Sequence, residues 1–198
     1  ITSPNGLVCI GVNEGNRFKG KGEIELNDKS IYNGTLTIES SKIIEGSGKI
    51  TFPGGDVLIV NWDNDGYTGI GRRNFGVNNE GDSLYEEGTF RNGLLTGKGK
   101  KASYFGTADN LKYTIYEGNF VNGSFNGAGK IKVFMPDNEI FSYSIITADW
   151  VDNQAKYGTI EWIIPMTETY QKKETYTGDI KGLTADGIGK FVYLDGSI

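Results

Sequence analysis

The chain carries few of the side chains that enzymes use for covalent or metal chemistry. It has 198 residues, no histidine and one cysteine, Cys9. Without histidine, neither serine–histidine nor cysteine–histidine catalysis is available, and the commonest metal ligand is missing. Cys9 has no partner base, so we expect it to be a small buried hydrophobic residue. These residue types predict a protein that is not an enzyme and that needs no cofactor or metal.

Two short segments look like ligand-binding motifs. Gly66, Gly69 and Gly71 lie close together, as in loops that cradle phosphate. Such a loop opens a helix, and no helical period follows this segment, so we reject a phosphate site. Asp63 and Asp65 flank Asn64 in a turn pattern. Too few oxygen ligands lie nearby for calcium, and a turn-forming role is the better interpretation.

A third set of residues is basic and directly follows a recurring Gly-x-Gly motif. Its members are Lys49, Arg72, Lys100, Lys130 and Lys190. On successive hairpins they would stand roughly 10 Å apart and form a ladder that could meet phosphates or an acidic partner. Cross-strand charge pairing is the alternative, because the same face holds Glu87, Glu117, Asp149 and Asp179. The net charge of −5 argues against nucleic acid and makes anionic lipid a weak expectation.

The Gly-x-Gly motif is the organising feature of the chain. Its second glycine returns at intervals of 23 to 31 residues, at Gly22, Gly48, Gly71, Gly99, Gly129, Gly158 and Gly189. The sixth copy keeps only this second glycine and has Lys156 in place of the first. Such spacing is typical of stacked supersecondary units. No linker interrupts the pattern, so we expect residues 1–198 to form a single array, itself a fragment of a longer chain.

Each unit reads as one β-hairpin. In the clearest unit, Tyr116, Gly118 and Phe120 alternate with polar residues, and period-two alternation indicates a strand. Asn122 and Gly123 then give a hairpin turn signal. We therefore predict an all-β fold, an elongated single-layer antiparallel sheet of about seven stacked β-hairpins.

One face of the predicted sheet combines glycines with aromatic rings. A glycine lets a ring on a neighbouring strand lie flat across the backbone. The frame also assigns Val8, Ile10 and Val12 to this face in the first hairpin. The rings form a candidate partner-binding surface, or alternatively the distributed core of the fold. The residues assigned to partner binding are Tyr32, Trp62, Phe90, Tyr116, Phe120, Trp150, Trp162 and Tyr176.

The segment from Tyr116 to Gly129 resembles the MORN repeat, whose pattern is Tyr-Glu-Gly-x-Trp-x-x-Gly-x-x-x-Gly-x-Gly. Segments 88–99 and 176–189 match less fully, and Trp62 and Trp150 occupy the tryptophan position. Seven such units cover nearly the whole chain. The resemblance implies antiparallel hairpins in one extended sheet, with roles in scaffolding, dimerisation and protein–protein contact. Phospholipid binding is a looser implication.

We therefore expect a non-catalytic protein-interaction or scaffold module. Its aromatic face would bind a partner peptide, a helix or a second array, which includes a homodimer. Two alternatives remain open: a regulatory domain whose catalytic domain lies outside this chain, and an anionic phospholipid adaptor that uses the basic ladder. The sequence shows no signal peptide and no apolar run of transmembrane length. An intracellular, cytoplasmic location is favoured.

Overall fold

The computed structural model describes residues 8–64, 66–77, 81–105, 112–135, 142–165, 171–194 and 197. Within these residues the chain forms fourteen β-strands and no helix. The strands are hydrogen-bonded in chain order as one open antiparallel sheet, so that they make seven hairpins. The prediction of an all-β sheet of stacked hairpins is thereby confirmed. By its internal contacts the chain divides into two compact units, residues 1–96 and 97–198.

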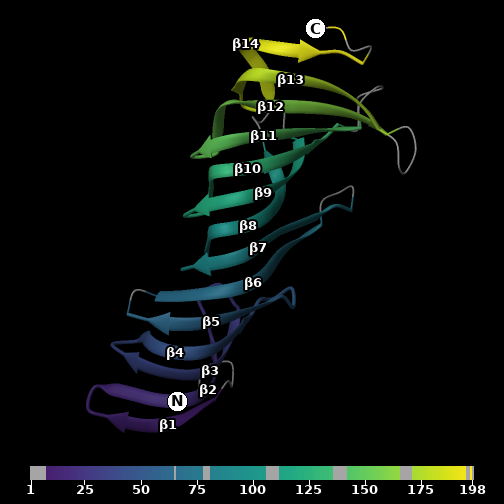
Figure 1. Ribbon diagram of the computed structural model, residues 1–198. Helices are drawn as coiled ribbons and strands as arrows, with labels where there is room; N and C mark the ends of the chain where they lie inside the picture. Colours follow the sequence, from purple (N-terminus) through teal and green to yellow (C-terminus); the bar gives the residue numbers. More distant parts are fainter. Residues whose placement is uncertain are drawn as a thin grey trace. The chain divides into compact units, whose positions relative to one another are not determined.

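Consecutive strands lie side by side along the chain (Figure 1). The N-terminal unit contains β1 (Cys9–Glu14), β2 (Arg17–Glu25), β3 (Ile31–Glu39), β4 (Lys42–Thr51), β5 (Val57–Asp63), β6 (Gly66–Val77), β7 (Ser83–Arg91) and the start of β8 (Leu94–Phe105). The C-terminal unit contains the rest of β8 and then β9 (Lys112–Val121), β10 (Ser124–Phe134), β11 (Tyr143–Val151), β12 (Gln154–Pro165), β13 (Gln171–Lys181) and β14 (Thr184–Val192).

Two-residue turns close several hairpins. Asn122 and Gly123 join β9 to β10 with φ angles of 49° and 81°, and Ser40 and Ser41 join β3 to β4 with 50° and 64°. Two successive positive φ angles match the right-handed twist of the strands, and Asn-Gly adopts them at little cost. The Asn-Gly signal in the sequence thus falls at the tip of a hairpin.

In most repeats the second glycine lies opposite a small residue of the next hairpin, whereas Gly48 lies opposite Val60. Gly22 pairs with Gly34, Gly71 with Gly88, and Gly158 with Gly178. Glycines also face one another within a hairpin, as Gly118 and Gly129 do, and this close backbone contact makes space for a ring. A Cβ on Gly118 would lie 2.5 Å from the hydroxyl oxygen of Tyr116 and 2.7 Å from the Cα of Gly129. The glycine pair is therefore a bed for the tyrosine of its own hairpin.

The first glycine of the motif has a different role in some hairpins. Gly127 has a φ of 73°, and the register between β9 and β10 shifts between Phe125 and Gly129. A positive φ at a bulge favours glycine because a Cβ would strain the backbone. Gly46, by contrast, has no positive φ and faces Trp62 on the next hairpin. The first glycine is therefore a turn or bulge position in some hairpins and a packing position in others.

In the C-terminal unit four buried rings form one cluster within the core. Tyr116 stacks on Phe125 with centroids 3.8 Å apart and planes 4° from parallel. Phe120 and Trp150 meet this pair edge-on at 5.2 to 5.8 Å. Trp150 also donates its Nε1–H to the carbonyl oxygen of Gly129. Edge-to-face and stacked pairs of this kind stabilise beyond their buried area.

One core position of the hairpins was not predicted from the sequence pattern. It lies just after the hairpin turn, where Phe125 is 3% exposed and faces Phe120 across the hairpin. Leu95 and Ala155 are buried at the same place in their own hairpins, after the turns that begin β8 and β12. The signal that could have found this position is an apolar residue two or three places after the turn.

The assignment of the first strand is wrong by one residue. Cys9, not Ile10, pairs with Gly22 and is buried. Val8, Ile10 and Val12 point to the other face with exposed fractions of 47%, 79% and 60%. Because side chains alternate, a one-residue slip in register moves every side chain of a strand to the opposite face.

An ion pair interrupts the apolar core between the third and fourth hairpins. Arg73 and Glu86 are paired across β6 and β7, with 2.6 Å between Nη2 and Oε2. Arg73 also donates to the carbonyl oxygen of Gly93 and lies within 6 Å of the Phe75 and Phe90 ring centroids. The corresponding contact between the fifth and sixth hairpins is Ile131 against Ile146.

Candidate functional site

The sheet offers two faces, which we name the ring face and the open face. The ring face carries the glycine pairs and the aromatic residues assigned to partner binding. Most of those rings are closed to solvent, with exposed fractions of 0 to 1% for Tyr32, Phe90, Tyr116, Phe120 and Trp150. These five side chains are core residues in the structure. Whether this face binds a partner stays a prediction.

The remaining members of the ring face are more accessible. Tyr176 is 6% exposed, and Trp62 and Trp162 are half-buried. Trp62 packs edge-on against Tyr32 at 5.9 Å and against Tyr67 at 4.9 Å. A partner on this face would therefore meet the two half-buried tryptophans before any other ring of the set.

Burial changes the acidity of the tyrosines on the ring face. Removal from solvent raises the pKa of Tyr32 and of Tyr116 to about 12 in each case. Both buried hydroxyl groups still donate a hydrogen bond. Tyr32 donates to the carbonyl oxygen of Thr35 at 2.5 Å, and Tyr116 donates to the carbonyl oxygen of Asn119 at 3.2 Å. Burial in an apolar site favours the neutral phenol, which is the physical cause of these shifts.

The basic ladder lies on the open face. Lys49, Arg72, Lys130 and Lys190 are exposed, and Lys100 is half-buried. Arg72 makes a 3.9 Å ion pair with Glu87 and stacks 3.8 Å from the ring centroid of Tyr85. Anion binding by the ladder stays a prediction.

In the C-terminal unit, an acidic residue on a neighbouring strand faces two lysines of the ladder. Glu117 stands directly opposite Lys100 on one side and Lys130 on the other. Opposite charges at facing positions of an antiparallel pair attract one another. The arrangement therefore supports charge pairing as one role of these lysines.

The open face of the N-terminal unit also exposes large aliphatic side chains. Ile59 and Ile70 face one another across β5 and β6, and their exposed fractions are 59% and 63%. Val57, two residues before Ile59, is 37% exposed. We call these three residues the aliphatic patch. Lys49 lies beside Ile59 on β4, and Arg72 follows Ile70 by two residues, so basic groups border the patch.

A polar groove of about 570 Å3 crosses strands β2 to β5 on the same unit. Six of its residues occupy open-face positions in two rows, and Gly20, Leu36, Gly46 and Trp62 lie at the strand positions between them. Thr35 and Ser47 are in hydrogen-bond contact, with 3.3 Å between their hydroxyl oxygens. The six open-face residues are Lys19, Thr35, Thr37, Glu45, Ser47 and Asn61.

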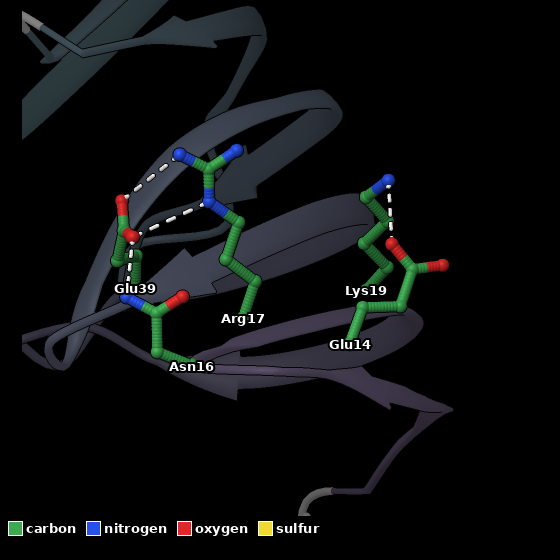
Figure 2. Close-up of polar contacts among 5 residues, drawn as sticks. All are labelled: Glu14, Asn16, Arg17, Lys19 and Glu39. Atoms are coloured by element: carbon green, nitrogen blue, oxygen red, sulfur yellow. Dashed lines mark hydrogen bonds and ion pairs between the residues drawn. The ribbon is translucent and has the colours of Figure 1, made fainter.

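Ion pairs border the groove where β1, β2 and β3 meet (Figure 2). Lys19 bonds Glu14 at 2.9 Å, so the one cation that lines the groove is already paired. Arg17 and Asn16 both donate to Glu39, and these hydrogen bonds lower the pKa of that carboxyl group. These pairs are exposed, and salt screens them.

The described residues offer little for metal chemistry or membrane spanning. They contain no group of three or more Cys, Asp or Glu side chains placed to hold a metal ion. Burial raises the pKa of Cys9, which disfavours the thiolate that a nucleophile needs. The described ranges contain no helix whose length and apolar character would let it cross a membrane.

The geometry defines the class of protein before any comparison does. It is a β-hairpin repeat array in which glycine pairs hold the tyrosine and tryptophan rings. The family model of the MORN repeat matches three segments, residues 42–57, 87–103 and 116–132. The chain therefore contains three MORN repeats, and its other hairpins follow the same pattern less closely. MORN repeats are generally non-catalytic and are typical of scaffold or membrane-binding proteins. No curated protein matches the chain.

Proposed function

We propose that this chain is a non-catalytic protein-interaction or scaffold module that contacts its partner through the aliphatic patch. The observation that carries the proposal is the direct pairing of Ile59 and Ile70, each more than half exposed. Scattered exposed aliphatic residues are ordinary on protein surfaces, but adjoining ones that stay this exposed favour a contact site.

The surroundings of the patch support a protein partner. Lys49 and Arg72 border it, so an apolar segment with acidic residues would match both its centre and its rim. The ring face is a weaker candidate, because a partner could reach Tyr32, Phe90, Tyr116, Phe120 or Trp150 only by opening the sheet. On that face Trp62 and Trp162 remain as contact residues. A regulatory domain beside a catalytic domain elsewhere would use the same patch.

A comparison of two matched variants tests the proposal. Ile59→Ser with Ile70→Ser removes the patch, whereas Val121→Ser with Val151→Ser alters two exposed valines of the other unit. Each protein is used as bait, and the captured proteins are quantified by mass spectrometry. We expect at least one partner to be lost with the isoleucine variant alone. Identical capture by both variants and the wild type would contradict the proposal.

The same variants also test two other functions, lipid binding and self-association. Vesicles that contain phosphatidylserine test the basic ladder, and light scattering tests pairing with a second copy. Binding to vesicles that survives the isoleucine change but falls steeply with salt would favour the ladder as a lipid site. A dimer that the isoleucine change dissociates would identify the second copy as the partner.

A further inference from the structure

We infer that the polar groove over β2 to β5 holds an extended peptide segment of the partner and that Glu45 receives a basic side chain of that segment. The inference rests on the proposed function, because the groove adjoins the aliphatic patch. Ser47 and Asn61 of the groove are each two residues from Lys49 and Ile59, on the same face of β4 and β5. A chain that leaves the patch across the strands enters the groove.

The width of the groove selects an extended chain. Its two rows of side chains, Lys19–Thr37–Glu45 and Thr35–Ser47–Asn61, lie two residues apart along their strands, or roughly 7 Å. An α-helix with its side chains is about 10 Å across and does not fit between such rows. An extended chain does fit. Each row crosses three strands, a distance of roughly 10 Å, which corresponds to about three residues of an extended peptide.

The chemistry of the lining points the same way. Hydroxyl groups of Thr35, Thr37 and Ser47 and the amide of Asn61 both donate and accept hydrogen bonds. An extended backbone has free N–H and C=O groups to meet them, whereas a helix has already paired its own.

The charged residues of the groove predict the charge of the ligand. Lys19 and Glu45 are its charged residues, and Glu14 neutralises Lys19 at 2.9 Å. Within the described part of the chain, Glu45 is in no ion pair and is solvent-exposed. One uncompensated carboxylate therefore remains in the groove, and a lysine or arginine on the peptide complements it.

Two capped synthetic peptides test the inference by NMR on the isotope-labelled full chain. The first is Ser-Val-Ser-Arg-Ser-Val, and the second has glutamate in place of arginine. We expect the arginine peptide to shift the amide signals of Thr35, Ser47 and Asn61, and to bind about fivefold more weakly to Glu45→Gln. The control variant Glu117→Gln, on the open face of the other unit, leaves binding unchanged. The glutamate peptide binds no better than the arginine peptide does to Glu45→Gln.

Two results would overturn the inference: no shifts at the three groove residues with the arginine peptide, or equal affinity for wild type and Glu45→Gln. Neither result bears on capture by the aliphatic patch. Loss of a partner with the isoleucine variant but no groove shifts would therefore leave the proposed function standing and remove the groove. Groove shifts with unchanged capture would do the reverse.

Discussion

Tyr32 closes over Gly34 and Gly46, and the contact leaves no room for a methyl group at either glycine. A Cβ on Gly34 would lie 2.6 Å from the Cα of Gly48 and 2.8 Å from the Tyr32 hydroxyl oxygen. Neither neighbour can move away, because one is backbone and the other is fully buried. At the scale of the residue, the repeat consists of this contact between a ring and two glycines.

The variant Gly34→Ala tests that contact. We expect it to lower the free energy of unfolding by about 2 kcal/mol, as overpacking of a filled core does. Gly54→Ala is the matched control, because the nearest atom to its Cβ would be 4.0 Å away and its φ is ordinary. Urea denaturation of both variants gives the comparison. Equal stability of the two would contradict the packing role of this first-strand glycine.

Residue types alone could predict the glycine–ring face but not every member of it. Tyr116, Gly118 and Gly129 are recognisable from spacing. Val8, Ile10 and Val12 alternate as convincingly, yet the pairing of β1 with β2 places Cys9 inside. An alternating pattern locates a strand, whereas its face is fixed by register with the neighbour. Strand β1 has described pairing with β2 only, so fewer contacts constrain it.

At the scale of the element, hairpins are joined by facing side chains of adjacent strands. Ile50 meets Leu58, and Ile131 meets Ile146, but Arg73 meets Glu86. The last pair is largely buried, with side-chain exposures of 20% and 8%. A charged pair at one junction distinguishes it from the apolar junctions, and it contributes to stability only when both partners are present.

Removing one partner of this pair should cost more than removing both. Arg73→Met takes away the cation beside a buried carboxylate, and we expect a loss of about 3 kcal/mol. Arg73→Ile with Glu86→Tyr installs the residue types that face one another at the Ile24–Tyr32 and Ile160–Tyr176 junctions. The stability of this double variant should lie within about 1 kcal/mol of the wild type or above it. Thermal unfolding of the wild type, of Arg73→Met and of the double variant measures these differences in stability. A double variant less stable than Arg73→Met would contradict this account of the junction.

The hairpins were predictable from turns and alternation, but their irregularities were not. The register shift between Phe125 and Gly129 moves Phe125 into the core beside Tyr116. This irregularity inserts two residues into β10, an even number, so the alternation is the same on either side and the sequence pattern does not reveal it. For the same reason the core position after the turn was missed. The open-face groove was missed as well, because it depends on rows that run across strands.

At the scale of the whole molecule, the account assigns the two faces of the sheet to different tasks. The ring face supplies the core in both units, through Tyr32 in one and Tyr116 in the other. The open face carries the patch and groove of the N-terminal unit and the lysines of the C-terminal unit. The sequence predicted the composition of both faces, but not the burial of the rings, because exposure cannot be read from residue type. The assignment of partner binding to the rings stays a prediction.

Sealed tyrosines also make stability depend on pH at the alkaline end. An unfolded tyrosine loses its proton near pH 10, whereas Tyr32 and Tyr116 hold theirs until about 12. Between these values the unfolded state releases protons that the native state keeps. The stabilising contribution of each ring is therefore complete below pH 10 and is lost as the pH rises toward 12.

An NMR titration of tyrosine labelled with carbon-13 at Cζ tests the central claim most directly. The claim is that the rings of the repeat are sealed on their glycine beds in both units. It predicts that the signals of Tyr32 and Tyr116 begin to titrate only about two pH units above the ordinary value of 10. Tyr32→Phe and Tyr116→Phe assign the two signals. Titration of both rings near pH 10 would show that the ring face is open to solvent and would contradict the account.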